Sequence, residues 1–333
     1  MSFPRFNLER FENSSGDERK NQSDELDKIC SETGFLVIEG HGVSQRAIKD
    51  QWNIVSKFFS SPLEVKREVK VPYSGYPYGW IGPDQEALAA SKGEVTPPDL
   101  KESFNGGPLN IPKNIKDSAA YEFCYQPTLW PKIEGFREIW ERYYAEMERL
   151  AKRIMAAFAE ALGLENSYFD RFINNPISAL RALHYPETND FIIDKQQRAG
   201  AHTDYGSLTI LLPQAGTSGL QIKKKNTWVD VPALEDCFVI NIGDLMELWT
   251  AKRWISTLHR VVAKPNQPAR KSLAYFHQPD WEATIKPISN SSSEAVVSGP
   301  YLMEKLKVQI YRFDDQTSIP RAVTGTVCNI VLF

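Results

Sequence analysis

The chain has 333 residues, of which 42% are hydrophobic and 24% charged, as expected for a globular protein with one large domain or two small ones. The formal net charge of −3 provides no basic field for binding nucleic acid. No apolar run reaches the roughly 18 residues that a membrane span needs, and the N-terminus lacks a signal-peptide core.

The cysteines are widely separated and form no C-x-x-C pair; they are Cys30, Cys124, Cys237 and Cys328. This spacing predicts free thiols rather than a disulfide framework or a zinc site. Because free thiols are typical of a reducing compartment, we expect a cytoplasmic protein.

The N-terminal half is predicted to be mainly helical. A short strand is expected around Phe6, within the otherwise polar and loosely patterned residues 1–23. Helices are predicted over residues 24–33 and 44–60, and in the second of these the apolar residues form a stripe. The apolar run Phe35–Ile38 between them predicts a strand.

Residues 72–131 are rich in glycine, proline and aromatic residues, which predicts loops of the kind that often carry specificity. The longest periodic segment follows, over residues 135–162, where apolar residues recur at three- and four-residue steps. Gly163 then provides a helix stop. We expect this helix to lie against a sheet as a spine.

From Ser178 onward, short apolar segments alternate with turn residues, which predicts a β-sandwich or open barrel. The fold class is therefore α+β with a mainly β core. The run Lys223–Lys225 is most simply an exposed hairpin turn. The expected strands are 179–185, 199–203, 207–213, 219–223, 228–231, 237–241, 256–262 and 271–277.

His202, Asp204 and His259 form a candidate metal site. If residues 199–203 are extended, His202 and Asp204 point from one face toward the same ion, whereas His259 follows after 54 intervening residues. Either part alone is weak, because such residues are common on surfaces and in ordinary cores. Together, two imidazoles and one carboxylate suit Fe(II) and leave positions open for O2 chemistry.

Arg270 and Ser272 strengthen this interpretation. They follow His259 after 10 residues and lie two apart on an expected strand, so they should face the same way. A guanidinium is a fixed, bidentate cation that recognises a carboxylate. The combined spacing therefore indicates a metal site beside a site for an anionic co-substrate.

With these residues, the chain resembles the isopenicillin N synthase-like Fe(II)- and 2-oxoglutarate-dependent oxygenases over nearly its whole length. Further segments carry the resemblance: Glu32–Val43 for "GF…HGV", Asp99–Phe104 for "D-K-E-F", Leu183–Pro186 for "YP" and Val239–Leu245 for "N-x-G-D". The resemblance implies a double-stranded β-helix, or jelly roll, with iron inside its mouth. It divides the chain into a helical N-terminal region (1–175), the oxygenase core (176–290) and a C-terminal segment expected to cap the site (291–333).

The resemblance also implies a chemistry. His202, Asp204 and His259 would bind Fe(II), 2-oxoglutarate would take two of the remaining positions, and O2 the last. Arg270, Ser272 and Tyr185 would contact the far carboxylate of 2-oxoglutarate. The reaction would couple decarboxylation of 2-oxoglutarate to succinate with hydroxylation, desaturation or cyclisation at an unactivated C–H bond. The Asp204 carboxylate argues against a halogenase.

Several nearby residues have less specific interpretations. Many plant relatives have asparagine where this chain has Leu183, which changes the expected co-substrate contacts. Arg181 either reaches the pocket and binds an acidic substrate group or faces solvent. Asn241 and Asp244 are expected to fix a turn and support the ligands. Apolar residues are expected to protect the oxidant from water, and the candidates are Leu220, Ile222 and Phe276.

The other histidines are not expected to bind metal. His41 lies in a Gly-His-Gly turn, and His184 should point away from its neighbour Tyr185. The role of His277 stays open. Candidate lid segments are residues 72–98, Phe104–Asn105 and Asp314–Phe333.

Three other functions are alternatives to the oxygenase. An iron oxidase of the isopenicillin N synthase or aminocyclopropane carboxylate oxidase type would keep the iron and dispense with 2-oxoglutarate. A non-catalytic ligand-binding module would not need all three metal ligands, and a zinc hydrolase would leave Arg270 and Ser272 without a role. We expect a monomer or weak homodimer that acts on a small molecule, in specialised metabolism, and contacts neither nucleic acid nor a membrane.

Overall fold

The computed structural model describes residues 3–73, 75–288 and 294–305, together with the backbone of two short strands further along the chain. The helices, with 3₁₀ helices labelled η, are α1 (Leu8–Asn13), α2 (Gly16–Glu32), α3 (Gln45–Phe59), α4 (Leu63–Arg67), η1 (Leu88–Lys92), α5 (Ser118–Cys124), α6 (Phe136–Ala161), η2 (Asp170–Phe172), α7 (Asp244–Trp249) and α8 (Ser298–Lys305). The strands are β1 (Arg5–Asn7), β2 (Phe35–Glu39), β3 (Gly79–Ile81), β4 (Glu102–Gly106), β5 (Ala179–Tyr185), β6 (Gln197–His202), β7 (Leu208–Pro213), β8 (Leu220–Lys224), β9 (Thr227–Asp230), β10 (Phe238–Ile242), β11 (His259–Val262), β12 (Arg270–His277), β13 (Thr284–Ile285), β14 (Val296–Val297), β15 (Tyr311–Arg312) and β16 (Arg321–Ala322).

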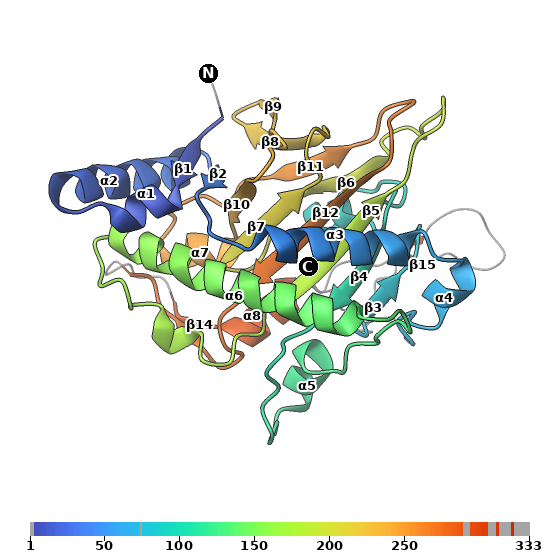
Figure 1. The fold of residues 1–333 in the computed structure, drawn as a ribbon, viewed down its shortest axis with the longest axis horizontal. Helices are drawn as coiled ribbons and strands as arrows, with labels where there is room; N and C mark the ends of the chain where they lie inside the picture. The colour runs from blue at the N-terminus through green and yellow to red at the C-terminus, as the bar shows by residue number, and fades with distance from the viewer. Residues whose placement is uncertain (1–2, 74, 289–293, 306–310, 313–320, 323–333) are drawn as a thin grey trace.

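Two sheets form the centre of the protein (Figure 1). The larger has eight strands in the order β1-β2-β10-β7-β12-β5-β4-β3, and the smaller has four in the order β6-β11-β8-β9. Neighbouring strands pair antiparallel, except for the parallel pair β1 and β2. This arrangement confirms the predicted jelly roll in an α+β fold.

Each central strand of the larger sheet contributes to two cores, because successive side chains point to opposite faces. On β12, Leu273 and Tyr275 belong to the core on the helical side. Ala274 and Phe276 belong to the core that also contains residues of the smaller sheet, such as Leu220. The face between the sheets is therefore the one on which a site can form.

The long helix α6 and the shorter α3 run across the outer face of the larger sheet (Figure 1). Apolar residues of α6 such as Leu150 and Ile154 are buried there, which confirms the predicted spine helix over 135–162. The helix predicted over 44–60 is also confirmed as α3, and its N-cap Ser44 accepts a hydrogen bond from the Ala47 amide.

The N-terminal helix was predicted too short. The chain is helical from Gly16 rather than residue 24, and α1 precedes it. This polar stretch lacks a clear apolar stripe. Hydrogen bonds and an ion pair with other parts of the chain stabilise it instead. The Arg19 guanidinium binds the Glu160 carboxylate at 2.5 Å and the Phe11 carbonyl at 2.6 Å.

Residues 72–131 are less loop-like than predicted, because β4 is a fully buried strand of the larger sheet. Its polar residues, among them Ser103 and Asn105, concealed the strand in the sequence. Phe104 packs edge-on against Trp140 of α6, with ring centroids 5.1 Å apart. The prediction that Phe104–Asn105 forms part of a lid is therefore wrong.

Smaller differences concern the strand ends. The strand predicted over 256–262 begins at His259, and before it the Thr257 hydroxyl donates to the Thr33 carbonyl at 2.7 Å. The short helix α7 was not predicted. The hairpin turn at Lys223–Lys225 is confirmed, with Lys225 in the left-handed region at φ 54°.

The described cysteines, Cys30, Cys124 and Cys237, are free thiols as predicted, and Cys328 lies outside the described residues. The proposed lid segment Asp314–Phe333 also lies outside them, apart from the backbone of β16. Among the described helices, none combines the length and apolar character required to cross a bilayer.

Candidate active site

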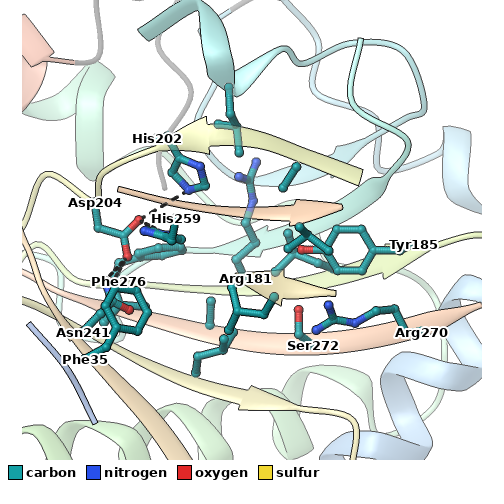
Figure 2. A pocket seen from close by; sticks show the side chains of 18 residues that line it. Phe35, Arg181, Tyr185, His202, Asp204, Asn241, His259, Arg270, Ser272 and Phe276 are labelled. Atoms are coloured by element: carbon teal, nitrogen blue, oxygen red, sulfur yellow. Dashed lines mark hydrogen bonds and ion pairs between the residues drawn. The ribbon is translucent and has the colours of Figure 1, made fainter. Parts of the chain in front are cut away.

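A cavity of about 70 Å³ lies between the two sheets. Residues from the larger sheet, such as Arg270 and Ser272, line it together with residues from the smaller sheet, such as His202 and His259. In Figure 2, the candidate metal ligands lie at one end of the cavity, and Arg270, Ser272 and Tyr185 lie at the other. The fold therefore brings both groups of predicted site residues into one pocket.

His202, Asp204 and His259 come together as the sequence predicted. His202 is the last residue of β6 and pairs directly with His259, the first residue of β11. The Asp204 Oδ1 atom lies 3.7 Å from His202 Nε2 and 3.6 Å from His259 Nε2. One ligand atom from each residue lies within 4.8 Å of the others, and all three residues are buried. This spacing suits a shared metal ion.

Backbone carbonyls orient both imidazoles. His202 Nδ1 lies 2.7 Å from the Gly200 carbonyl oxygen, and His259 Nδ1 lies 3.0 Å from that of Thr257. A proton on Nδ1 would donate to these carbonyls and leave the Nε2 lone pairs directed toward Asp204. Burial and the neighbouring His259 lower the pKa of His202 to about 3, so its imidazole is neutral and available as a ligand.

Hydrogen bonds from neighbouring side chains fix the orientation of the Asp204 carboxylate. Its Oδ2 atom accepts hydrogen bonds from Asn241 Nδ2 at 2.7 Å and from the Thr209 hydroxyl, while Oδ1 faces the imidazoles. Burial would raise the pKa of Asp204, but the two imidazoles and these hydrogen bonds outweigh burial and lower it. The expected supporting role of Asn241 is confirmed, and Asp244 donates its amide to the Asp204 carbonyl at 2.8 Å.

The other end of the cavity carries a positive charge that has no acidic partner among the described residues. Arg270 is 3% exposed, and its Nε and Nη1 atoms have no hydrogen-bond partner among the described residues. The guanidinium carbon lies 5.0 Å from the centre of the Tyr185 ring, and Ser272 lies two residues along the same strand. A buried guanidinium without a paired anion lowers the stability of the folded protein. This end of the cavity therefore suits a carboxylate ligand.

Arg181 points into the protein, so the alternative in which it faces solvent is wrong. It is 2% exposed and lines the cavity. Its Nη2 atom lies 2.6 Å from a Glu86 carboxylate oxygen, and its Nε donates to Asn105 Oδ1 at 2.7 Å. Its charge is therefore already compensated within the protein.

The three remaining histidines do not line the cavity. His184 Nδ1 lies 2.9 Å from Glu102 on the helical side of the sheet, which confirms that it points away from Tyr185. His277 Nδ1 lies 2.8 Å from the Ser207 hydroxyl, and His41 Nε2 lies 3.1 Å from Asp236.

The walls of the cavity are mostly apolar. Leu220 and Phe276 line it as predicted and so does Leu183, whereas Ile222 is buried beside it. The sequence did not single out Phe35, whose ring meets His259 edge-on at 5.2 Å between centroids, or Leu88 of η1. The alternation of Phe35 and Val37 toward one face of β2 is the signal that could have placed Phe35 there.

Comparison with known proteins agrees with this geometry. The sequence model of the 2OG-Fe(II) oxygenase superfamily matches residues 176–279. The model described as "non-haem dioxygenase in morphine synthesis N-terminal" matches residues 3–133. The matched regions together contain both sheets and the cavity.

Full-length relatives lead to the same family. The chain is 31% identical over 303 residues to the 2-oxoglutarate-dependent dioxygenase thnC of Trichoderma harzianum, covering 89% of this chain and 90% of the relative. It is 33% identical over 299 residues to the 2-oxoglutarate-dependent dioxygenase tropC of Talaromyces stipitatus, covering 85% and 87%.

Solved structures share the fold and hold the expected ligands. A full-length Neurospora crassa protein in complex with alpha-KG superposes with a TM-score of 0.78 and 28% identity, covering 90% of this chain and 94% of that one. JOX2 in complex with 2OG, Fe and JA superposes with a TM-score of 0.69 and 26% identity, covering 88% and 79%. The chain therefore belongs to the 2-oxoglutarate- and Fe(II)-dependent oxygenase superfamily and is a dioxygenase that uses Fe(II), 2-oxoglutarate and O2.

Proposed function

We propose that this dioxygenase couples decarboxylation of 2-oxoglutarate to oxidation of an unactivated C–H bond in a small, uncharged organic molecule. One observation carries the proposal: a single buried cavity joins a His-Asp-His cluster to an arginine that lacks an acidic partner among the described residues. A keto acid with a second carboxylate is a ligand that can span both ends.

In this proposal the roles are divided along the cavity. His202, Asp204 and His259 would hold Fe(II), which supplies the O2-activating redox chemistry when bound. Arg270 would bind the far carboxylate of 2-oxoglutarate through its free N–H groups, and Ser272 and Tyr185 would donate hydroxyl hydrogen bonds to it.

The protein also orients the ligands and excludes water. The hydrogen bonds from Asn241 and Thr209 keep one oxygen of Asp204 directed toward the metal position. Apolar side chains such as Phe35, Leu220 and Phe276 line the cavity and keep water from the reacting centre.

The charge of the walls suggests which substrates fit. Apart from the groups assigned to the metal and to 2-oxoglutarate, the charged residue lining the described cavity is Arg181, and Glu86 already neutralises it. A charged substrate group would enter without an opposite charge to pair with. We therefore expect a neutral substrate; among structural neighbours, the Neurospora crassa protein has been crystallised with alpha-KG and thymine.

The test is the formation of succinate from 2-oxoglutarate by the purified protein, with and without Fe(II). We expect Fe(II)-dependent succinate formation that is lost in His202→Ala and His259→Ala and retained in the matched control His184→Ala, because His184 does not line the cavity. Oxidation of a substrate without 2-oxoglutarate would instead support the iron oxidase.

Substrate charge can be tested with a panel of small molecules grouped as neutral, anionic and cationic. We expect the compounds that accelerate succinate formation to be neutral. Acceleration confined to carboxylates or to amines would contradict the assignment of Arg181 as a wall residue whose charge Glu86 neutralises.

A further inference from the structure

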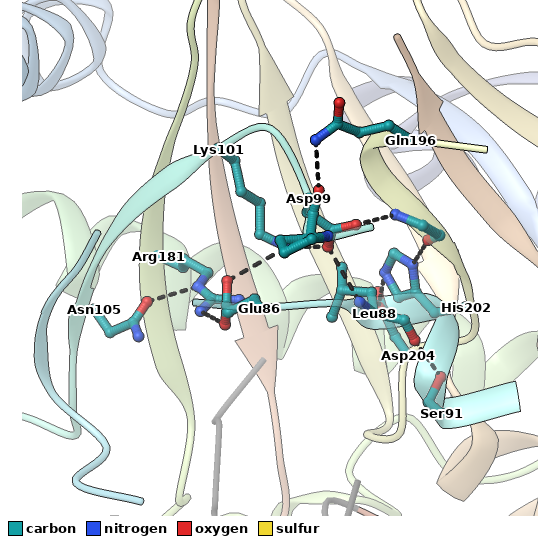
Figure 3. A network of polar contacts seen from close by, with 12 residues as sticks. Glu86, Leu88, Ser91, Asp99, Lys101, Asn105, Arg181, Gln196, His202 and Asp204 are labelled. Carbon is teal, nitrogen blue, oxygen red and sulfur yellow. Dashed lines mark hydrogen bonds and ion pairs between the residues drawn. The ribbon is translucent and has the colours of Figure 1, made fainter. Parts of the chain in front are cut away.

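Four buried charged side chains lie beside the cavity in a network that the binding of Fe(II) and 2-oxoglutarate does not explain. They are Glu86, Asp99, Lys101 and Arg181, two acids and two bases (Figure 3). Lys101 Nζ lies 2.8 Å from Asp99 Oδ2 and 3.3 Å from Glu86 Oε2, and each of the four side chains is at most 5% exposed. Asp99 and Lys101 come from the D-K-E-F segment, for which the proposed function has no role.

Asp99 connects parts of the chain that are distant in sequence. Its Oδ1 atom accepts the Gly200 amide of β6 at 2.9 Å. Its Oδ2 atom accepts the Leu88 amide of η1 at 3.1 Å and the Lys101 ammonium. Both carboxylate oxygens are therefore occupied, and they join η1 to the strand that carries His202.

From Gly200 the connection continues to the metal ligand. The Gly200 carbonyl is the group that orients His202, at 2.7 Å from Nδ1. A side chain at Gly200 has no room, because an added Cβ would lie 2.7 Å from the Ala89 amide nitrogen of η1. The η1 segment also contacts Thr203, the residue after His202. The Lys92 ammonium donates to the Thr203 hydroxyl at 2.7 Å.

The remaining charges keep Asp99 in place. Burial would raise the pKa of Glu86, but Arg181 and Lys101 outweigh it and lower the pKa to about 2. Asp99 and Glu86 likewise overcome the effect of burial and raise the pKa of Lys101. Lys101 thus binds both acids as a cation, and Arg181 completes the neutralisation.

We propose that this network is a positioning device for His202, in which Asp99 fixes Gly200 and thereby the imidazole that Gly200 orients. Asp99 also fastens η1 over β6, so that Leu88 closes one wall of the cavity. The inference rests on the proposed role of His202 as an Fe(II) ligand. Asp99 itself does not line the cavity and is a positioning residue.

The test compares Asp99→Asn with Glu102→Gln. Glu102 is a matched control because it is another buried carboxylate of the same segment, bound to Lys66, Trp80 and His184 on the far side of the sheet. Both variants lose a buried charge, so both should lower the unfolding temperature. Asparagine has one acceptor oxygen in place of two. It therefore cannot accept the Gly200 amide and the Leu88 amide of η1 as the two carboxylate oxygens of Asp99 do.

The decisive measurement is the affinity for Co(II) alone, together with its visible absorption, which reports the coordination geometry. We expect Asp99→Asn to weaken Co(II) binding about 10- to 100-fold and to alter the absorption, as for other residues that orient metal ligands. Glu102→Gln should bind Co(II) within about twofold of the natural protein, as expected for a site without contact to the ligands.

Equal Co(II) affinity in the two variants would overturn the inference while leaving the proposed function intact. Failure of the natural protein to bind Co(II) or Fe(II) would instead remove the proposed function itself. If Asp99→Asn does not fold, the double variant Asp99→Leu with Lys101→Met removes the acceptors without leaving an unpaired charge at these positions, and the same loss of affinity is expected.

Discussion

At the scale of one residue, Arg270 is the proposed contact for the far carboxylate of 2-oxoglutarate, and its side chain is buried. A buried cation destabilises a protein unless an anion pairs with it, and the Nε and Nη1 atoms of Arg270 have no hydrogen-bond partner among the described residues. Burial therefore lowers its pKa, although a guanidinium stays charged. In the proposed function, a carboxylate that binds Arg270 would recover this free energy.

Replacing Arg270 with lysine should raise the Kd for 2-oxoglutarate about 10- to 100-fold, because an ammonium cannot form the bidentate hydrogen bonds of a guanidinium. Anaerobic titration of the Fe(II)-loaded protein measures this. The matched control is Arg260→Lys, which changes a guanidinium that binds Gln221 and stacks on Trp228. An equal effect in both variants would show that Arg270 is not the carboxylate clamp.

His277 should make stability depend on pH. Burial lowers the pKa of His277 to about 4, whereas in the unfolded chain its pKa is about 6.5. Between these two pH values, His277 is neutral in the folded protein and protonated in the unfolded chain. Stability from this residue is therefore complete above pH 6.5 and is lost as the pH falls toward 4, by about 3 kcal/mol in all.

Urea unfolding at several pH values measures this dependence. In His277→Gln, the free energy of unfolding should fall less steeply between pH 6.5 and 4 than in the natural protein, even if the variant is less stable throughout. Parallel curves for the two proteins would show that His277 is not the source of the dependence.

At the scale of elements, the parts that the sequence predicts are those with a regular apolar pattern. The helices α3 and α6 have such a pattern because each packs one face on the sheet. The helix α2 and the strand β4 do not, since Arg19 and the buried polar residues of β4 are held by contacts from distant parts of the chain. Local patterns cannot reveal such contacts, so the first part of α2 (residues 16–23), the strand β4 and the charge network were not predicted.

The contact between α6 and the sheet can be tested at Leu150, which is 1% exposed. Leu150→Ala should lower the free energy of unfolding by about 2–5 kcal/mol, because it leaves a cavity in the core. Arg149→Ala, at a side chain that is 63% exposed, should change it by about 0.5 kcal/mol or less. Urea denaturation compares them, and equal losses would argue against this packing.

At the scale of the whole molecule, the cavity depends on both sheets being in place. The candidate metal ligands lie on or beside strands of the smaller sheet, whereas Arg270 and Tyr185 are paired residues on β12 and β5 of the larger one. Unfolding separates these groups. Ligands that need both ends of the cavity should therefore bind the folded protein and stabilise it.

Calorimetric unfolding measures this coupling. Mn(II) and 2-oxoglutarate together should raise the unfolding temperature, since a ligand at about 100 times its Kd stabilises the folded state by about 2.7 kcal/mol. The same 2-oxoglutarate concentration with EDTA should have a smaller effect, because one end of the cavity then lacks its metal. An unchanged unfolding temperature in both mixtures would contradict the shared site.

The pairing of His202 with His259 across β6 and β11 has a consequence for strand registration. The ladder between these strands is irregular, with shifts on either side of Val261. A slip by one residue would turn an imidazole from the interior toward the opposite face. An ion bound to both histidines would resist that slip, so metal binding would stabilise the observed register between β6 and β11.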